Sequence, residues 1–111
     1  MGVKADMIAP EKLSSEAASL RTRVDEASAF LKKLSNPDRL MVCCALVDGE
    51  RSVRELEDLL GIRQPGLSQQ LAELREAGLV ASRKEGKQVF YRPADPRIAT
   101  FIHTMHVLFC E

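Results

Sequence analysis

The sequence predicts a mostly α-helical domain with one β-hairpin, in the element order α-α-α-α-β-β-α. Apolar residues recur at spacings of three and four between residues 14 and 77, which is the pattern of helices that bury one face. The spacing changes to an alternation of two between Leu79 and Arg92, as in paired strands. An apolar stripe with helical spacing returns after the proline and aspartate cluster at residues 93–96.

The composition predicts one globular domain. The chain has 111 residues, 45% hydrophobic and 29% charged, which is enough for a single core. No apolar run approaches the roughly 20 residues that cross a bilayer, and the N-terminus lacks the apolar core of a secretory signal, so we expect a cytoplasmic protein. Residues 1–12 show little periodicity and predict a flexible N-terminal arm, whereas residues 13–111 predict the folded domain.

Two helices are expected on either side of Asn36. A long helix over residues 14–34 carries one apolar stripe, and Asn36 is a good N-cap for a second helix over residues 37–47. This second helix is apolar on every side over residues 40–47, so we expect it to be buried all round. It contains the adjacent pair Cys43 and Cys44.

Two short helices joined by a tight turn come next. Residues 52–55, Ser-Val-Arg-Glu, form a capping box, because the hydroxyl and the carboxylate each satisfy a free backbone N–H group. That helix stops at Gly61, and another runs from Pro65 to about Ala77. Three residues share one face of it: Leu67, Leu71 and Leu74.

The hairpin and the last helix complete the outline of a winged helix-turn-helix. The hairpin turns at Glu85-Gly86-Lys87, and Asp95 is expected to cap the last helix. In a helix-turn-helix the second helix enters the major groove of DNA, with its N-terminal residues facing base edges. The outer, N-terminal positions of that helix are the predicted DNA-binding residues Gln64, Gly66, Ser68 and Gln69. The alternative is that these Gln and Ser residues are ordinary surface residues that do not contact DNA.

Positive charge gathers at the hairpin of a chain whose formal net charge is zero, with 16 basic and 16 acidic residues. The zero balance argues against a generally basic nucleic-acid coat but allows a local patch. We expect Arg83, Lys84 and Lys87 to contact DNA as the wing, near the single acid Glu85. We also expect a homodimer through the first and last helices that binds double-stranded DNA at an inverted-repeat operator.

The chain resembles the ArsR family of bacterial winged-helix repressors from roughly residue 27 to the end. Three segments carry the resemblance: LSNPDRLMVCCAL at residues 34–46, SVRELEDLLGIRQPGLSQQLAELREAGLV at residues 52–80 and KEGKQVFYRP at residues 84–93. Family members typically show Ser-Gln-Pro-x-x-Ser-x-His-Leu in the recognition region. This chain departs from that pattern at Gly66, which brings no side chain to a base, and at Gln70.

The metal-binding patterns of the family are not matched. Where one type has Cys-Val-Cys, this chain has Ser-Val-Arg at residues 52–54, and where another has Asp-x-His, it has Asp-Pro-Arg at residues 95–97. His103 and His106 share a helical face, but two histidines without further ligands are more often surface residues than a metal site. We therefore expect no metal and no cofactor.

The resemblance extends to the sulfur- and redox-responsive BigR and SqrR type of this family. It implies that Cys44 and Cys110 are the sensing thiols, that Cys43 is a packing residue, and that an intrasubunit bridge of two or more sulfurs releases the DNA. Helical geometry alone does not choose between Cys43 and Cys44, because adjacent residues point about 100° apart.

The predicted function is a repressor released from its operator by persulfide, polysulfide or oxidants that link Cys44 and Cys110. We expect no enzyme, because no Cys-x-x-Cys, glycine-rich phosphate loop or Ser/His/Asp set stands out. Three alternatives stay open at this point: a metal-responsive ArsR-type repressor with Cys44, Cys110 and His106 as ligands, a thiol enzyme, and an oxidant sensor that forms a plain disulfide.

Overall fold

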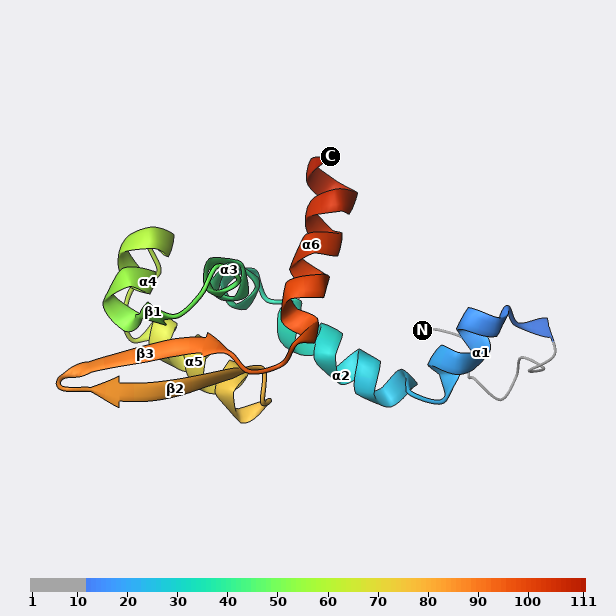
Figure 1. The fold of residues 1–111 in the computed structure, drawn as a ribbon, viewed down its shortest axis with the longest axis horizontal. Helices are drawn as coiled ribbons and strands as arrows, with labels where there is room; N and C mark the ends of the chain where they lie inside the picture. The colour runs from blue at the N-terminus through green and yellow to red at the C-terminus, as the bar shows by residue number, and fades with distance from the viewer. Residues whose placement is uncertain (1–11) are drawn as a thin grey trace. The chain divides into compact units, whose positions relative to one another are not determined.

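The computed structural model describes residues 12–111, so residues 1–11 of the predicted arm lie outside the described part of the chain. Within the described residues, the chain divides into two compact units, residues 12–32 and 33–111. The elements, shown in Figure 1, are α1 (Ser15–Arg21), α2 (Val24–Leu34), α3 (Pro37–Leu46), β1 (Arg51–Ser52), α4 (Val53–Leu60), α5 (Gly66–Glu76), β2 (Val80–Glu85), β3 (Gln88–Pro93) and α6 (Arg97–Cys110).

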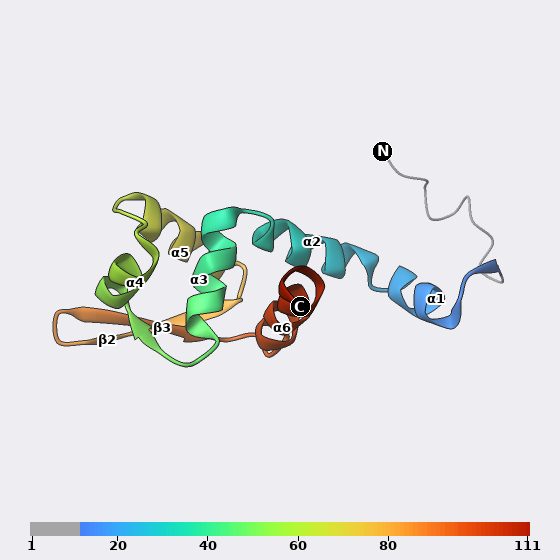
Figure 2. The same cartoon turned by 90° about the horizontal axis from the view of Figure 1, so that it is seen from above.

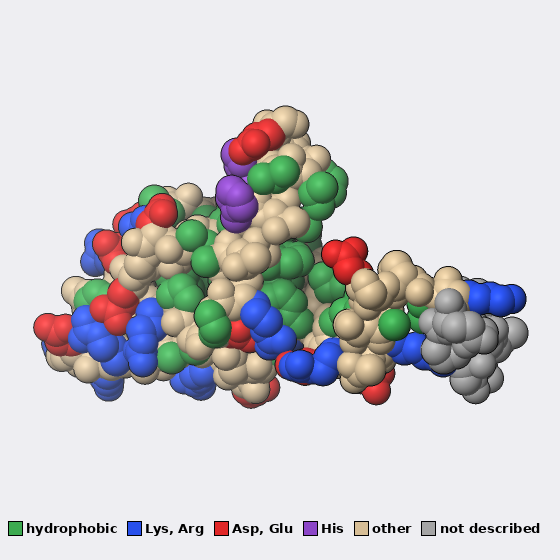
Figure 3. All heavy atoms as spheres, turned by 45° about the vertical axis from the view of Figure 1, so that its right-hand side comes forward, with side chains coloured by type: hydrophobic (Ala, Val, Ile, Leu, Met, Phe, Trp, Pro, Cys, Tyr) green, Lys and Arg blue, Asp and Glu red, His purple; other side chains and the backbone are tan. Residues whose placement is uncertain are grey.

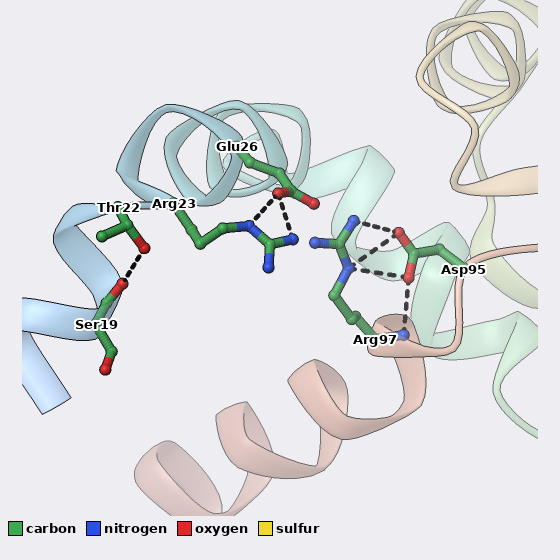
Figure 4. A network of polar contacts seen from close by, with 6 residues as sticks. All are labelled: Ser19, Thr22, Arg23, Glu26, Asp95 and Arg97. Carbon is green, nitrogen blue, oxygen red and sulfur yellow. Dashed lines mark hydrogen bonds and ion pairs between the residues drawn. The ribbon is translucent and has the colours of Figure 1, made fainter.

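The prediction of one continuous helix over residues 14–34 is wrong, because the helix breaks between α1 and α2. The Thr22 hydroxyl donates to the Ser19 carbonyl at 2.7 Å (Figure 4), and the backbone N–H groups of Thr22 and Arg23 bond back three residues instead of four. A threonine hydroxyl that takes a carbonyl of the preceding turn competes with the regular helix ladder. The apolar spacing continues through the break and does not reveal it.

Helix α3 occupies the middle of the second unit, as the views in Figures 1 and 2 show, and contacts α4, α5, β3 and α6. Its N-terminus is capped as predicted, because the Asn36 side chain accepts the Arg39 N–H at 3.0 Å. Val42, Cys43 and Leu46 are fully buried. The expectation that this helix is buried all round is wrong, because one side of it is open to solvent at a methionine, Met41, that is 48% exposed.

The helix pair α4 and α5 follows the prediction closely. Both hydrogen bonds of the capping box are present: the Glu55 N–H donates to Ser52 Oγ at 3.0 Å, and the Ser52 N–H donates to Glu55 Oε1 at 2.7 Å. Gly61 ends α4 with φ of 69°, a left-handed conformation that favours glycine. The predicted apolar face of α5 is fully buried, as its three leucines Leu67, Leu71 and Leu74 show.

The predicted hairpin is part of a three-stranded antiparallel sheet with the order β1-β3-β2. Strand β1 was not predicted, since a strand of two residues, the second of which is the helix cap Ser52, carries no periodic signal. It pairs with β3 through Arg51 opposite Tyr91. On the other edge of β3, Ser82 of β2 lies opposite the same tyrosine. The mostly α-helical fold with a hairpin after the helix pair is confirmed.

Helix α6 leaves the packed part of its own unit as it proceeds. The Asp95 carboxylate accepts the Arg97 N–H at 2.9 Å and pairs with the Arg97 guanidinium at 2.7 Å (Figure 4), although the helix begins one residue later than a cap at Asp95 would place it. Ile98 is 1% exposed and Phe109 is 79% exposed. None of the helices in residues 12–111 has the length and apolar character that a membrane crossing requires.

Loss of the capping box should destabilise the fold measurably. Ser52→Ala removes the acceptor for the Glu55 N–H, so we expect the free energy of unfolding to fall by about 1 kcal/mol. Chemical denaturation followed by circular dichroism measures this value. Ser28→Ala on the exposed side of α2 is the matched control and should change it by less than about 0.5 kcal/mol. Equal losses in the two variants would contradict the role of the cap.

Candidate DNA interface and thiol pair

The N-terminal end of α5 presents three of the predicted DNA-binding residues to solvent. Gln64, Ser68 and Gln69 are exposed, and Gly66 is half-buried. Gln64 Oε1 accepts hydrogen bonds from the Ser68 N–H at 3.1 Å and from Ser68 Oγ at 2.6 Å. Gln64 therefore also satisfies one of the free N–H groups at the start of α5. A Cβ built on Gly66 would meet no atom within 4 Å, so the backbone is open to close approach there.

An open groove of about 740 Å³ separates the helix pair from the hairpin turn. Ser68 lines it from α5 and Lys87 from the turn, so the structure brings together one predicted residue from each DNA-binding element. Arg54 at the start of α4 adds a second cation, while Glu57 and Asp58 line the same groove. The groove is therefore mixed in charge. Its basic groups, Arg54 and Lys87, come from the start of α4 and from the hairpin turn.

The three predicted wing residues are exposed but differ in their partners. Arg83 forms ion pairs with Glu50 and Glu85, both at 2.7 Å, so two carboxylates neutralise its positive charge. Lys84 and Lys87 form no ion pair within residues 12–111. Figure 3 shows basic and acidic side chains interleaved on the side that carries α4 and the hairpin. Sequence reasoning placed one acid near the wing and missed the second, which lies 33 residues from Arg83.

Side-chain contacts attach the middle of α5 to the start of α3 and to the end of α2. Arg39 Nη1 donates to Gln70 Oε1 at 2.9 Å and Arg39 Nε donates to the Lys33 carbonyl at 2.6 Å. Lys33 also pairs with Glu73 at 2.6 Å. The partner of Gln70 is separated by 31 residues and gave no signal in the sequence. Gln70, which departs from the family pattern, therefore points toward α3.

The three thiols have different surroundings, and all three are free. Cys43 is fully buried, and burial, with a smaller contribution from the neighbouring Cys44, raises its pKa to about 12. Cys44 is half-buried, and burial raises its pKa above the ordinary value. Cys110 is exposed at the end of α6. Because the thiolate is the reactive form, Cys43 is the least reactive of the three.

Helices α3 and α6 contact each other, so Cys44 and Cys110 lie on neighbouring helices. Figure 1 shows the C-terminal end of α6 extending away from α3. His106 lies one turn before Cys110 and its Nδ1 is 3.1 Å from Glu111 Oε2. Within residues 12–111, no group of three or more His, Cys, Asp or Glu side chains is arranged to hold a metal ion.

Residues 36–82 match the family model described as the bacterial regulatory protein, arsR family. The chain is 50% identical to the biofilm growth-associated repressor of Agrobacterium fabrum over an alignment of 92 residues. The alignment covers 83% of this chain and 79% of that relative. The chain belongs to the ArsR family. The transcriptional activator HlyU of Vibrio cholerae is 42% identical over 78% of this chain and 80% of its own length.

Solved structures of ArsR-family regulators agree with this fold. The crystal structure of the transcriptional repressor BigR from Xylella fastidiosa superposes with a TM-score of 0.83 at 44% identity, over 89% of this chain and 99% of that one. Reduced HlyU from Vibrio cholerae superposes with a TM-score of 0.77 at 39% identity, over 84% of this chain and 98% of that one. The winged helix-turn-helix is thus confirmed, and the chain is a DNA-binding transcriptional regulator, not an enzyme.

Alkylation should separate the three thiols of this ArsR-family protein. At pH 8 we expect iodoacetamide to label Cys110 first, Cys44 more slowly and Cys43 only after unfolding. A rise in pKa from 9.0 to about 12 lowers the thiolate fraction of Cys43 about a thousandfold. Fragmentation mass spectrometry distinguishes the adjacent cysteines. The labelling rate of Cys44 should keep increasing above pH 9.0, because its pKa is raised. Equal native labelling of Cys43 and Cys44 would refute this order.

Proposed function

We propose that this protein is a repressor that binds its operator as a reduced homodimer and is released when reactive sulfur species link Cys44 to Cys110. One observation carries the proposal: two accessible free thiols lie on contacting helices, α3 and α6, while the third is sealed in the core. The similarity to proteins named repressors, and to HlyU solved in its reduced form, supports it. A regulator of transcription works where the DNA is, which favours the cytoplasm.

A polysulfide supplies both the oxidant and the bridging sulfur. One thiolate attacks the central sulfur of a trisulfide R–S–S–S–R, expels RS⁻ and forms Cys–S–S–S–R. The second thiolate attacks that same sulfur and expels the other RS⁻, which leaves Cys44–S–S–S–Cys110. The trisulfide gains two electrons and the two cysteines lose two. Peroxide adds no sulfur and gives a plain disulfide at most.

The length of the link decides how far α6 has to move. A plain disulfide requires Cα atoms within about 7 Å of each other. The end of α6 extends away from α3 (Figure 1), so a bridge draws this end toward Cys44. An extra sulfur relaxes the distance requirement and favours polysulfide over peroxide as the inducer. Allosteric couplings of this kind are typically about 1–3 kcal/mol.

The movement of α6 reaches the DNA through the proposed dimer. The exposed part of α6 carries Val107, Leu108 and Phe109, which are 42%, 62% and 79% exposed. In the first unit, Leu20 and Leu31 are 55% and 53% exposed. Apolar side chains as open as these favour a two-fold interface with a second copy of the chain. Because Phe109 directly precedes Cys110, a bridge at this thiol rearranges the proposed interface and with it the spacing of the two recognition helices.

The DNA contacts proposed are those that the structure leaves available. Ser68 and Gln69 face base edges from α5 together with Gln64, and Gly66 lets the backbone approach the DNA. Lys84 and Lys87 contact phosphates from the wing. Two such surfaces in a homodimer read an inverted repeat. The sulfur donor, rather than a metal or another cofactor, is the proposed inducer.

The cysteine variants test the release mechanism. Cys44→Ser and Cys110→Ser should bind the operator as the natural protein does, but polysulfide should no longer release either from DNA. Cys43→Ala is the adjacent control, and polysulfide should still release this variant from the operator. Fluorescence anisotropy with an operator duplex measures release, and peptide mapping should find Cys44 joined to Cys110 with at least one additional sulfur.

Release of DNA from both serine variants by polysulfide would refute the thiol pair. A plain disulfide after both polysulfide and peroxide would identify a general oxidant sensor instead. If neither treatment links the thiols and stoichiometric zinc or copper releases the DNA, the metal-responsive alternative would replace the proposal.

The salt dependence of binding tests the wing. Lys87→Ala removes a proposed phosphate contact, so the slope of log affinity against log salt concentration should become less steep by about 1 for each subunit. Arg75→Ala, at the exposed far end of α5, is the control and should leave the slope unchanged. Titrations at several salt concentrations with one operator duplex measure both. An unchanged slope for Lys87→Ala would remove this lysine from the interface.

A further inference from the structure

The Arg83 side chain crosses the three-stranded sheet. Arg83 of β2 lies opposite Phe90 of β3, which in turn lies opposite Ser52 of β1. The Arg83 guanidinium carbon is 4.6 Å from the centre of the Phe90 ring, a cation–π distance. From there Nε and Nη2 donate to the two carboxylate oxygens of Glu50, at 2.9 and 2.7 Å. One side chain therefore connects the outer strand of the wing to the residue that precedes β1.

This connection lies on the face of the hairpin that does not pack on the core. Side chains alternate between the two faces of a strand, and Val80 and Tyr91, which share one face, are buried. Arg83 and Phe90 share the opposite face. Lys84 is on the same face as Val80, so neighbouring residues that look equivalent in the sequence have different surroundings.

The other end of the connection is close to the thiol-bearing helix. Glu50 lies in the turn between α3 and β1, and the adjacent Arg51 donates from Nε to the Ala45 carbonyl of α3 at 2.9 Å. Hydrogen bonding from Arg83 holds the pKa of Glu50 below its usual range, so this carboxylate stays charged at neutral pH. The wing is thus attached by side chains to the end of α3.

We propose that Glu50 and Arg83 are positioning residues for DNA binding: their bidentate ion pair over Phe90 holds the wing against the α3–β1 turn, and Arg83 does not bind phosphate. An arginine that already has two carboxylate partners, Glu50 and Glu85, has little net charge to offer DNA. This inference rests on the proposed operator binding and assigns Arg83 a role different from that of Lys84 and Lys87.

The variant Glu50→Gln tests whether Glu50 positions the wing or only adds negative charge near DNA, because the two roles predict opposite changes in DNA affinity. If Glu50 only places negative charge near DNA, its removal strengthens binding. If it positions the wing, its removal weakens binding, and we expect a loss of about fivefold, the equivalent of about 1 kcal/mol for an exposed ion pair. The salt slope should stay that of the natural protein, since no phosphate contact is lost. The probe is a duplex that the natural protein selects from a random pool.

Arg83 is tested by exchanging the two charges. Arg83→Glu alone should weaken binding, and the double variant Glu50→Arg/Arg83→Glu should recover at least part of that loss, because it restores an ion pair in the reverse direction. Circular dichroism and the unfolding midpoint verify that each variant folds. A phosphate-binding Arg83 predicts a reduced salt slope in Arg83→Gln, whereas a positioning Arg83 predicts an unchanged slope with lower affinity.

Three outcomes decide the matter. Weaker binding of Glu50→Gln at constant salt slope, with recovery in the double variant, supports the positioning role. Equal or tighter binding of Glu50→Gln, or a reduced slope in Arg83→Gln, overturns it while leaving the proposed function intact. If the natural protein selects no duplex, operator binding itself fails, and the inference fails with it.

Discussion

Apolar packing on α3 is the interaction on which the other elements of residues 33–111 depend. Val42, Cys43 and Leu46 have no solvent exposure, and α4, α5, β3 and α6 all contact this helix. Full burial of one Val or Leu side chain contributes about 1.5–3 kcal/mol. Helix α5, the β2–β3 hairpin and helix α6 are therefore all supported by α3. A change in the position of α3 acts on each of them at once.

The same packing gives the two adjacent cysteines different surroundings. Neighbouring positions on a helix point about 100° apart, so a helix with one buried side and one open side treats them differently. Cys43 faces the core and Cys44 lies at its margin. A buried thiol behaves as a small apolar side chain, which agrees with the apolar residue expected at that position by resemblance. The open side of α3, marked by Met41, leaves Cys44 partly accessible next to a stable core.

Local signals in the sequence predicted most of the fold, whereas contacts between distant segments escaped it. The capping box at Ser52 and the three leucines of α5 are encoded within a few residues, so spacing alone reveals them. The break at Thr22 depends on one hydroxyl that competes with the helix ladder, while the apolar stripe runs on. The Glu50–Arg83 pair needs the folded sheet to bring its members together. For the site, residue types were predictable, but the partners that decide their availability were not.

The attachment of α5 limits the motions by which this helix can respond. Gln70 and Glu73 lie about one turn apart on α5, and they are held from two different helices: Gln70 by Arg39 at the start of α3, and Glu73 by Lys33 at the end of α2. Two points of attachment along one helix remove its freedom to spin about its own axis, which a single bond would leave. A shift of α3 is therefore transmitted to α5 through the Arg39–Gln70 hydrogen bond and the buried leucines between the two helices. In the proposed regulator, a signal at α3 would therefore move the exposed N-terminal end of α5 as a whole, while the side chains presented there stay the same.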